Sequence, residues 1–194
     1  MNKLIVSLLI SLVPMAAMAE AKRPVKAAAV KANPGARFHE IAERYFQDGL
    51  TLNPLNGSQI TGDEKYEDKL EVNITPDYRA KAKALLVSTQ RELKSVNRAA
   101  LKPADQVSYD LLQEEIRDGL EGMTFPAELL PIDQFGGLPV YVAQFGSGQQ
   151  IQPLKTVKNY QNYLKRLEVL PQWAVQAETN MREGMKRGIV QPKA

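Results

Sequence analysis

The chain has no cysteine, one histidine and one tryptophan among its 194 residues. Without cysteine it can form no disulfide, so a domain of this length must be held together by its hydrophobic core. Zinc sites usually combine several histidine or cysteine ligands. A nucleophile activated by histidine would have to use the single residue His39. The composition therefore argues against a complete zinc site or catalytic triad within this chain.

His39 begins the sequence H-E-x-x-E, in which Glu43 takes the place of the second histidine of an H-E-x-x-H zinc motif. The histidine lies opposite the apolar residues Phe38 and Ile41 on the helix expected over residues 37–50. We therefore predict that His39 is a surface residue. No residue of the chain is predicted to be catalytic or to bind a metal, and no cofactor is expected for the chain itself.

Charges of both signs are interspersed. The chain contains 25 Lys and Arg against 22 Asp and Glu, for a formal net charge of +3. There is no long basic stripe of the kind that binds phosphate backbones, so a nucleic-acid partner is not expected.

The first 19 residues have the pattern of a secretory signal peptide. Lys3 precedes an apolar run over residues 4–13, Pro14 ends the run, and Ala17 and Ala19 give the small-x-small form of a signal peptidase site. The run is shorter than the about 20 residues of a spanning helix. We predict cleavage after Ala19, a periplasmic or secreted product, and no stable membrane span after cleavage. An uncleaved N-terminal anchor is the alternative.

Residues 20–36 are rich in Ala, Lys and Pro and are predicted to be a flexible linker before a helical domain over residues 37–194. Apolar residues recur at intervals of three and four, which is typical of amphipathic helices. Helices are predicted over residues 37–50, from Thr75 to about Asn97, and from Pro103 onward. The stretch 58–73 between the first two contains a run of acidic residues that matches no calcium loop, and a solvated loop or short helix is predicted there.

The stretch 156–188 predicts two amphipathic helices that meet at Pro171. Because proline has no N–H to donate, it either kinks the helix or stands in the first turn of a second one. Thr156 is the expected N-cap and Gly188 the expected left-handed stop. The apolar residues that fall at helical spacing are Val157, Tyr160, Leu164 and Leu167 before the proline, and Trp173, Ala177, Met181 and Met185 after it.

Residues 125–153 contain four glycines and four prolines and predict a long ordered loop. The β-branched and aromatic residues 140–142 are compatible with one short strand. The glycines match neither a dinucleotide-binding fingerprint nor a P-loop, so a phosphate cradle is disfavoured. Long loops within compact domains are often functional. The candidates for a substrate cleft are therefore Gln134, Phe135, Gly136, Gly137 and Tyr141.

Several motifs occur in an order that resembles the N-terminal part of the bacterial DUF885 family. The resemblance covers about residues 37–194. The motifs are F-x-x-x-A-x-x-Y-F from Phe38, N-P-x-x-x-x-x-x-G from Asn53, Q-V-S-Y-D-L-L from Gln106, L-P-I-D-Q-F-G-G from Leu130, S-G-Q from Ser147, Y-x-x-Y-L-K-R-L from Tyr160, and N-M-R-E-G-x-x-x-G-I-V-x-P-K from Asn180.

This resemblance implies an exported, mostly helical protein similar to zincin-type metallopeptidases. Family members are roughly three times longer, and their H-E-x-x-P-G-H-H zinc motif lies in a C-terminal half that this sequence does not contain. The resemblance therefore implies a peptide substrate and a zinc cofactor for the full-length relatives, and neither the zinc ligands nor the general base can be assigned to a residue here.

Two functional hypotheses follow. The chain is either the N-terminal fragment of such a peptidase, inactive alone, or a stand-alone periplasmic helical module that binds or interacts with other molecules. Whether it acts as an enzyme is left open. The predicted fold is all-α: an incomplete array of amphipathic helices with a long Gly/Pro-rich loop and room for a short strand.

Overall fold

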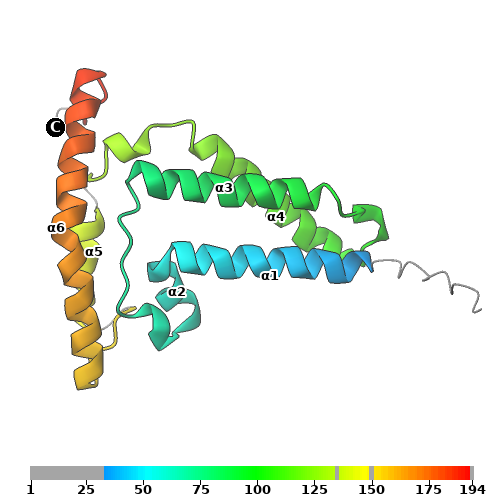
Figure 1. The fold of residues 1–194 in the computed structure, drawn as a ribbon, viewed down its shortest axis with the longest axis horizontal. Helices are drawn as coiled ribbons and strands as arrows, with labels where there is room; N and C mark the ends of the chain where they lie inside the picture. Colours follow the sequence, from blue (N-terminus) through cyan, green and yellow to red (C-terminus); the bar gives the residue numbers. More distant parts are fainter. Residues whose placement is uncertain (1–32, 134–135, 149–150, 193–194) are drawn as a thin grey trace, which may run out of the picture. The chain divides into compact units, whose positions relative to one another are not determined.

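The computed structural model describes residues 33–133, 136–148 and 151–192. The predicted signal peptide and nearly all of the predicted linker lie outside these residues. The described part is all-α, as predicted, and its only pairing of extended backbone is an isolated bridge between Ile132 and Gly137 (Figure 1). The elements are α1 Pro34–Leu52, α2 Pro54–Thr61, η1 Glu64–Tyr66, α3 Pro76–Leu93, η2 Arg98–Ala100, α4 Pro103–Gly122, η3 Ala127–Leu129, α5 Leu138–Phe145 and α6 Val157–Lys186.

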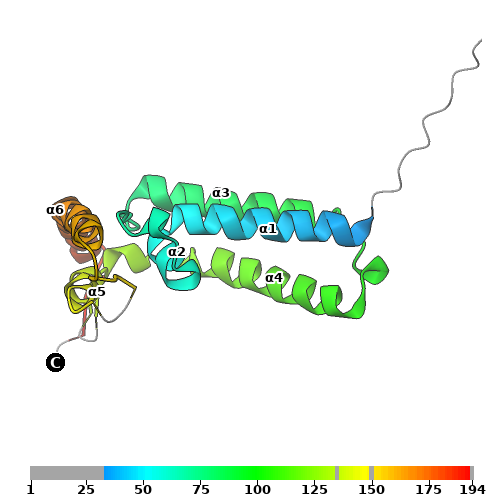
Figure 2. The same cartoon turned by 90° about the horizontal axis from the view of Figure 1, so that it is seen from below.

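Helices α1, α3 and α4 pack against one another around one hydrophobic core (Figure 2). Each helix has a proline in its first turn, where the missing N–H costs nothing. Asn33 and Thr75 cap α1 and α3 by accepting a backbone N–H. The predicted starts at Thr75 and Pro103 are confirmed. The buried core residues are Phe38, Ile41, Leu86, Leu93, Val96, Leu101, Tyr109, Leu112 and Ile116.

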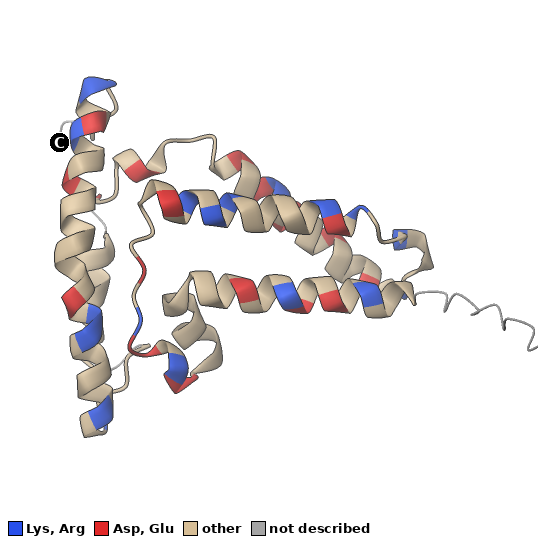
Figure 3. Ribbon diagram, in the orientation of Figure 1, with Lys and Arg blue, Asp and Glu red and all other residues tan. Residues whose placement is uncertain are grey.

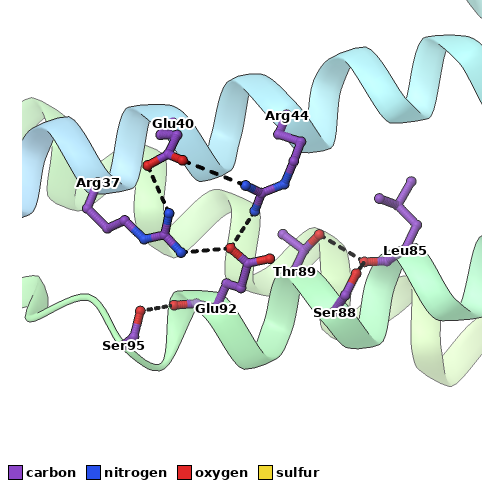
Figure 4. Close-up of polar contacts among 8 residues, drawn as sticks. All are labelled: Arg37, Glu40, Arg44, Leu85, Ser88, Thr89, Glu92 and Ser95. Carbon is purple, nitrogen blue, oxygen red and sulfur yellow. Dashed lines mark hydrogen bonds and ion pairs between the residues drawn. The ribbon is translucent and has the colours of Figure 1, made fainter.

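Ion pairs join α1 to α3 at the partly buried carboxylate of Glu92 (Figure 4). Arg37 donates to Glu92 at 2.9 Å, and Arg44 donates to the same oxygen. Glu40 lies between the two arginines on α1 and pairs with Arg37 at 2.8 Å. Lys and Arg alternate with Asp and Glu along the described helices, as the sequence indicated (Figure 3).

Helix α6 is one continuous helix of 30 residues, so the prediction of two helices meeting at Pro171 is wrong. Pro171 is exposed, and α6 continues through it although the proline cannot donate a hydrogen bond to the carbonyl of Leu167. The ends were predicted correctly. Thr156 caps the helix and exchanges hydrogen bonds with Asn159, and Gly188 follows the end with a positive φ of 69°.

The segment 140–142 is helical, which corrects the expectation of a short strand. It lies within α5, which begins after Gly137 with Pro139 in the first turn. Val142 and Phe145 lie three residues apart and are both buried in one cluster. A helix places residues at this spacing on the same face, so both side chains reach the core. The intrinsic preference of β-branched and aromatic residues for strands is weak, and tertiary packing can override it.

No helix in the described ranges combines the length and the apolar character that a membrane crossing would need.

Candidate functional site

The α6-bound segment, residues 67–75, connects η1 to α3 and lies along α6 (Figure 1). Leu70, Val72 and Ile74 alternate along it and pack into the clusters formed with α5 and α6. This alternation is the pattern of an extended chain with one buried side. Of the two alternatives predicted for residues 58–73, the short helix is found at the end of α2 and in η1, whereas the solvated loop is wrong, because Ser58 and the α6-bound segment contribute buried residues.

Arg166 links α6 to this segment through hydrogen bonds. Its side chain is fully buried, at 0% exposure. Nε donates to the carbonyl of Lys69 at 3.0 Å, Nη1 donates to Gln152 Oε1 at 2.6 Å, and Nη2 donates to the carbonyl of Tyr66 at 2.9 Å and to Ser58 Oγ. Burial lowers the pKa of Arg166, which the nearby acidic groups oppose. All three guanidinium nitrogens therefore have acceptors within the protein.

Further polar contacts extend along the same face of α6. Asn159 and Asn162 both donate to the buried carboxylate of Glu67, at 2.9 and 3.2 Å. Asn180 donates to the carbonyl of Ile74 at 2.9 Å. The side of α6 that packs on the protein thus includes several polar residues, because the buried carboxylate and carbonyl groups of the segment need hydrogen-bond donors.

Of the apolar stripe predicted before Pro171, only Leu167 packs partly into the protein, and the other three residues are exposed. Val157 is 75% exposed, Leu164 is 56% exposed, and Tyr160 and Val175 are also exposed. We call these four residues the outer stripe of α6. After the proline, Trp173 and Ala177 are buried, whereas Met181 and Met185 are exposed.

Glu71 lies between the buried Leu70 and the partly buried Val72, and it lines a cleft together with residues of α1, α3 and α6. Desolvation by burial raises the pKa of Glu71 to about 7, opposed by backbone N–H groups and by the charge of Arg166. Its Oε2 atom is buried without a hydrogen-bond partner in the described residues. A carboxyl group held in this way is a candidate functional residue.

The cleft has a volume of about 950 Å³ and is formed by the end of α1, the α6-bound segment and the start of α3. Tyr78 lies in its wall, and burial together with the charge of Glu71 raises the pKa of its hydroxyl to about 12. The cleft combines carboxylates, hydroxyl groups and apolar side chains. Its lining residues are Asp48, Thr51, Leu52, Glu71, Val72, Thr75, Asp77, Tyr78, Lys81, Ala84, Leu85, Ser88 and Gln172.

The site residues predicted from sequence lie elsewhere. Gln134 and Phe135 are outside the described residues. Gly136 and Tyr141 are brought together, because a Cβ on Gly136 would lie 2.7 Å from the Tyr141 hydroxyl oxygen, and Gly137 has a φ of 143°. Gly136, Gly137 and Tyr141 do not line the cleft, and their contact with a substrate stays a prediction.

The sequence contained a signal for Glu71 that its acidic neighbours obscured. The run Asp63, Glu64, Glu67, Asp68 and Glu71 looks like a solvated surface, and its outer members do pair with lysines of α6: Glu64 with Lys158 at 2.6 Å and Asp68 with Lys165 at 3.0 Å. The alternation of Leu70, Val72 and Ile74 is the one sequence feature that sets Glu71 apart from the other acidic residues of the run, because it indicates an extended chain with one buried side.

The described residues do not fit a zinc ion. They contain no group of three or more His, Cys, Asp or Glu side chains that could hold a metal. His39 is exposed, and its Nε2 lies 2.8 Å from Asp105 Oδ1 on α4. No chemical step through zinc is therefore derived for this chain.

One family model matches residues 54–194, and its description is "Bacterial protein of unknown function (DUF885)". The comparisons with curated proteins and with solved structures gave no match.

Proposed function

Because the chain belongs to the DUF885 family, we propose that it forms the helical N-terminal part of an exported, zinc-peptidase-like protein. In this proposal the zinc ligands are supplied by a zinc-motif half, which carries H-E-x-x-P-G-H-H in the longer relatives that the chain resembles. The present helices form a wall of the substrate cleft. On this proposal we expect no peptide hydrolysis by the chain alone.

The observation that carries the proposal is the outer stripe of α6. Val157, Tyr160, Leu164 and Val175 follow one another along one face of a long helix and are all exposed. Val157, Tyr160 and Leu164 lie within the first two turns, whereas Val175 lies three turns further on, beyond the exposed Glu168. Neighbouring exposed apolar side chains on one helix face are typical of a surface that contacts more protein, and this is the support for the proposal. The zinc-motif half is the occupant that we propose for it.

Association through α6 is testable with two purified proteins: residues 20–194, and the zinc-motif half of a longer family member. We expect the two to form a complex. Tyr160→Ser and Leu164→Ser should each weaken it at least about tenfold, which corresponds to the loss of a buried apolar side chain at an interface. The matched control is Gln161→Ser, a neighbouring exposed polar residue of α6. Isothermal titration calorimetry measures the affinities.

Two results would contradict this function. One is zinc-dependent peptide hydrolysis by residues 20–194 alone. The other is a complex that Tyr160→Ser and Leu164→Ser leave as tight as the Gln161→Ser control does.

A stand-alone periplasmic binding module is the second candidate, and the cleft beside Glu71 favours it. The two candidates differ in the behaviour of the isolated chain. A complete module stays monomeric and unfolds cooperatively, whereas a fragment with an uncovered α6 surface binds hydrophobic dyes and aggregates.

Export is part of the same proposal. With residues 1–19 as a signal peptide, we expect the mature protein to begin at Glu20 in the periplasm or the medium. Intact mass spectrometry of the protein from the periplasmic fraction measures this. A mass that includes Met1 would contradict cleavage and favour the uncleaved anchor.

A further inference from the structure

We propose that the cleft beside Glu71 binds a basic segment of a peptide, with a lysine or arginine side chain directed toward Asp48 and Glu71. This inference rests on the proposed function for the idea of a peptide and adds the class of residue that the cleft selects. Its test measures binding by the present chain and needs no hydrolysis.

The size and lining of the cleft suit such a ligand. Its volume of about 950 Å³ lies within the range of roughly 300–1,000 Å³ that ligand pockets have. Leu52, Val72 and Leu85 supply apolar surface from α1, the α6-bound segment and α3. Lysine and arginine carry an apolar stem below a charged head, so they can cover apolar surface and still reach a carboxylate.

The charge of the cleft favours a cation. Lys81, the one basic residue in the lining, pairs with Asp77 at 2.7 Å, so these two charges offset each other. The other acidic lining residues are Asp48 and Glu71. Neither forms an ion pair in the described part of the chain. Arg166 lies near Glu71, but its guanidinium nitrogens donate to other acceptors.

Glu71 also lacks a hydrogen bond that a cation can supply. Its Oε2 is closed to solvent and has no partner among the described residues, so a small turn of the side chain that brings this atom to a donor in the cleft relieves the cost of a buried, unpaired polar atom. Tyr78 stands beside it, because the charge of Glu71 contributes to the raised pKa of the tyrosine hydroxyl. A bound ammonium or guanidinium group therefore gains a charge partner and satisfies an existing acceptor.

The experiment uses residues 20–194 and two fluorescein-labelled peptides, Ala-Leu-Lys-Leu-Ala and Ala-Leu-Glu-Leu-Ala, with blocked ends. Fluorescence anisotropy at pH 8 should show at least tenfold tighter binding of the lysine peptide. Asp48→Asn and Glu71→Gln should each weaken that binding at least fivefold. Asp118→Asn, which removes an exposed carboxylate on α4, should leave it unchanged. Asp48 is exposed, so its variant keeps the fold even if Glu71→Gln alters stability.

Equal affinity for the two peptides, or unchanged binding by Asp48→Asn, would overturn the proposal. Competition by spermidine at the same concentration as the lysine peptide would also overturn it, since the cleft would then select a small polyamine. These outcomes are independent of the α6 interface. If the chain binds the lysine peptide but forms no complex with the zinc-motif half, only the proposed function is refuted. If the complex forms but the lysine peptide does not bind selectively, only this inference is refuted.

Discussion

Arg166→Ala is expected to lower the free energy of unfolding by about 3–5 kcal/mol, because four neutral buried acceptors lose a charged donor and each unsatisfied group costs about 1–3 kcal/mol, less than additively. The substitution removes the donor to the carbonyls of Tyr66 and Lys69 and to the side chains of Ser58 and Gln152. These acceptors would remain buried without partners, and a cavity would replace the side chain. Since domains are stable by only about 5–15 kcal/mol, the loss should be large in urea unfolding followed by circular dichroism.

The control for this variant is Arg182→Ala, on the same helix. Arg182 pairs with Glu178 at 2.6 Å, but both side chains are exposed, and such pairs contribute less than about 1 kcal/mol. Arg166→Lys separates charge from geometry: it keeps the charge, cannot reach all four acceptors, and should be nearly as damaging as Arg166→Ala. If Arg166→Ala unfolds at the same urea concentration as Arg182→Ala, the α6-bound segment is not held in this way.

Glu71→Gln is expected to stabilise the protein at pH 8 and to have little effect at pH 4.5. Burial raises the pKa of Glu71 from 4.5 to about 7 in the folded chain. The folded state therefore holds a proton that the unfolded state releases between these two values, and stability falls as pH rises through this window. At 1.4 kcal/mol per pKa unit the loss is roughly 3 kcal/mol at most. Glutamine stays neutral and retains a carbonyl oxygen as acceptor.

Urea unfolding at pH 4.5, 6 and 8 measures this effect. The wild-type protein should lose more stability between pH 4.5 and 8 than Glu71→Gln, and Asp118→Asn should follow the wild type because Asp118 is exposed. The charged group that acts on Glu71 is Arg166 from α6, and Asp48 from α1 lines the same cleft. Tyr78 from α3 stays neutral throughout this pH range, because its pKa is about 12. Identical pH profiles for the wild type and Glu71→Gln would show that the carboxyl group titrates as a solvated glutamate.

Local signals in the sequence predicted where helices begin and end. Prolines at residues 76 and 103, with Thr75 and Thr156 as caps, mark helix starts, and Gly188 marks a stop. These features act within one turn of the chain, so they need no knowledge of the neighbours. The ordered motifs likewise indicated the family, which the match over residues 54–194 confirms.

The candidate site was not predicted, because its residues come from four separate elements. Asp48, Glu71, Tyr78 and Gln172 come together only when α1, the α6-bound segment, α3 and α6 are packed. The predicted site in the loop at residues 134–141 relied on loop length alone, which says where function is common but not which side chains converge.

The sequence by itself determined that the chain is helical, where α3, α4 and α6 start, and which family it belongs to. Only the tertiary structure decided which face of α6 is buried. Periodicity predicted that Val157, Tyr160 and Leu164 face inward, yet the protein buries Asn159, Asn162 and Arg166 instead. The physical reason is that α6 packs on an irregular segment whose polar groups must be paired once water is excluded, and this requirement lies in the partner rather than in the helix.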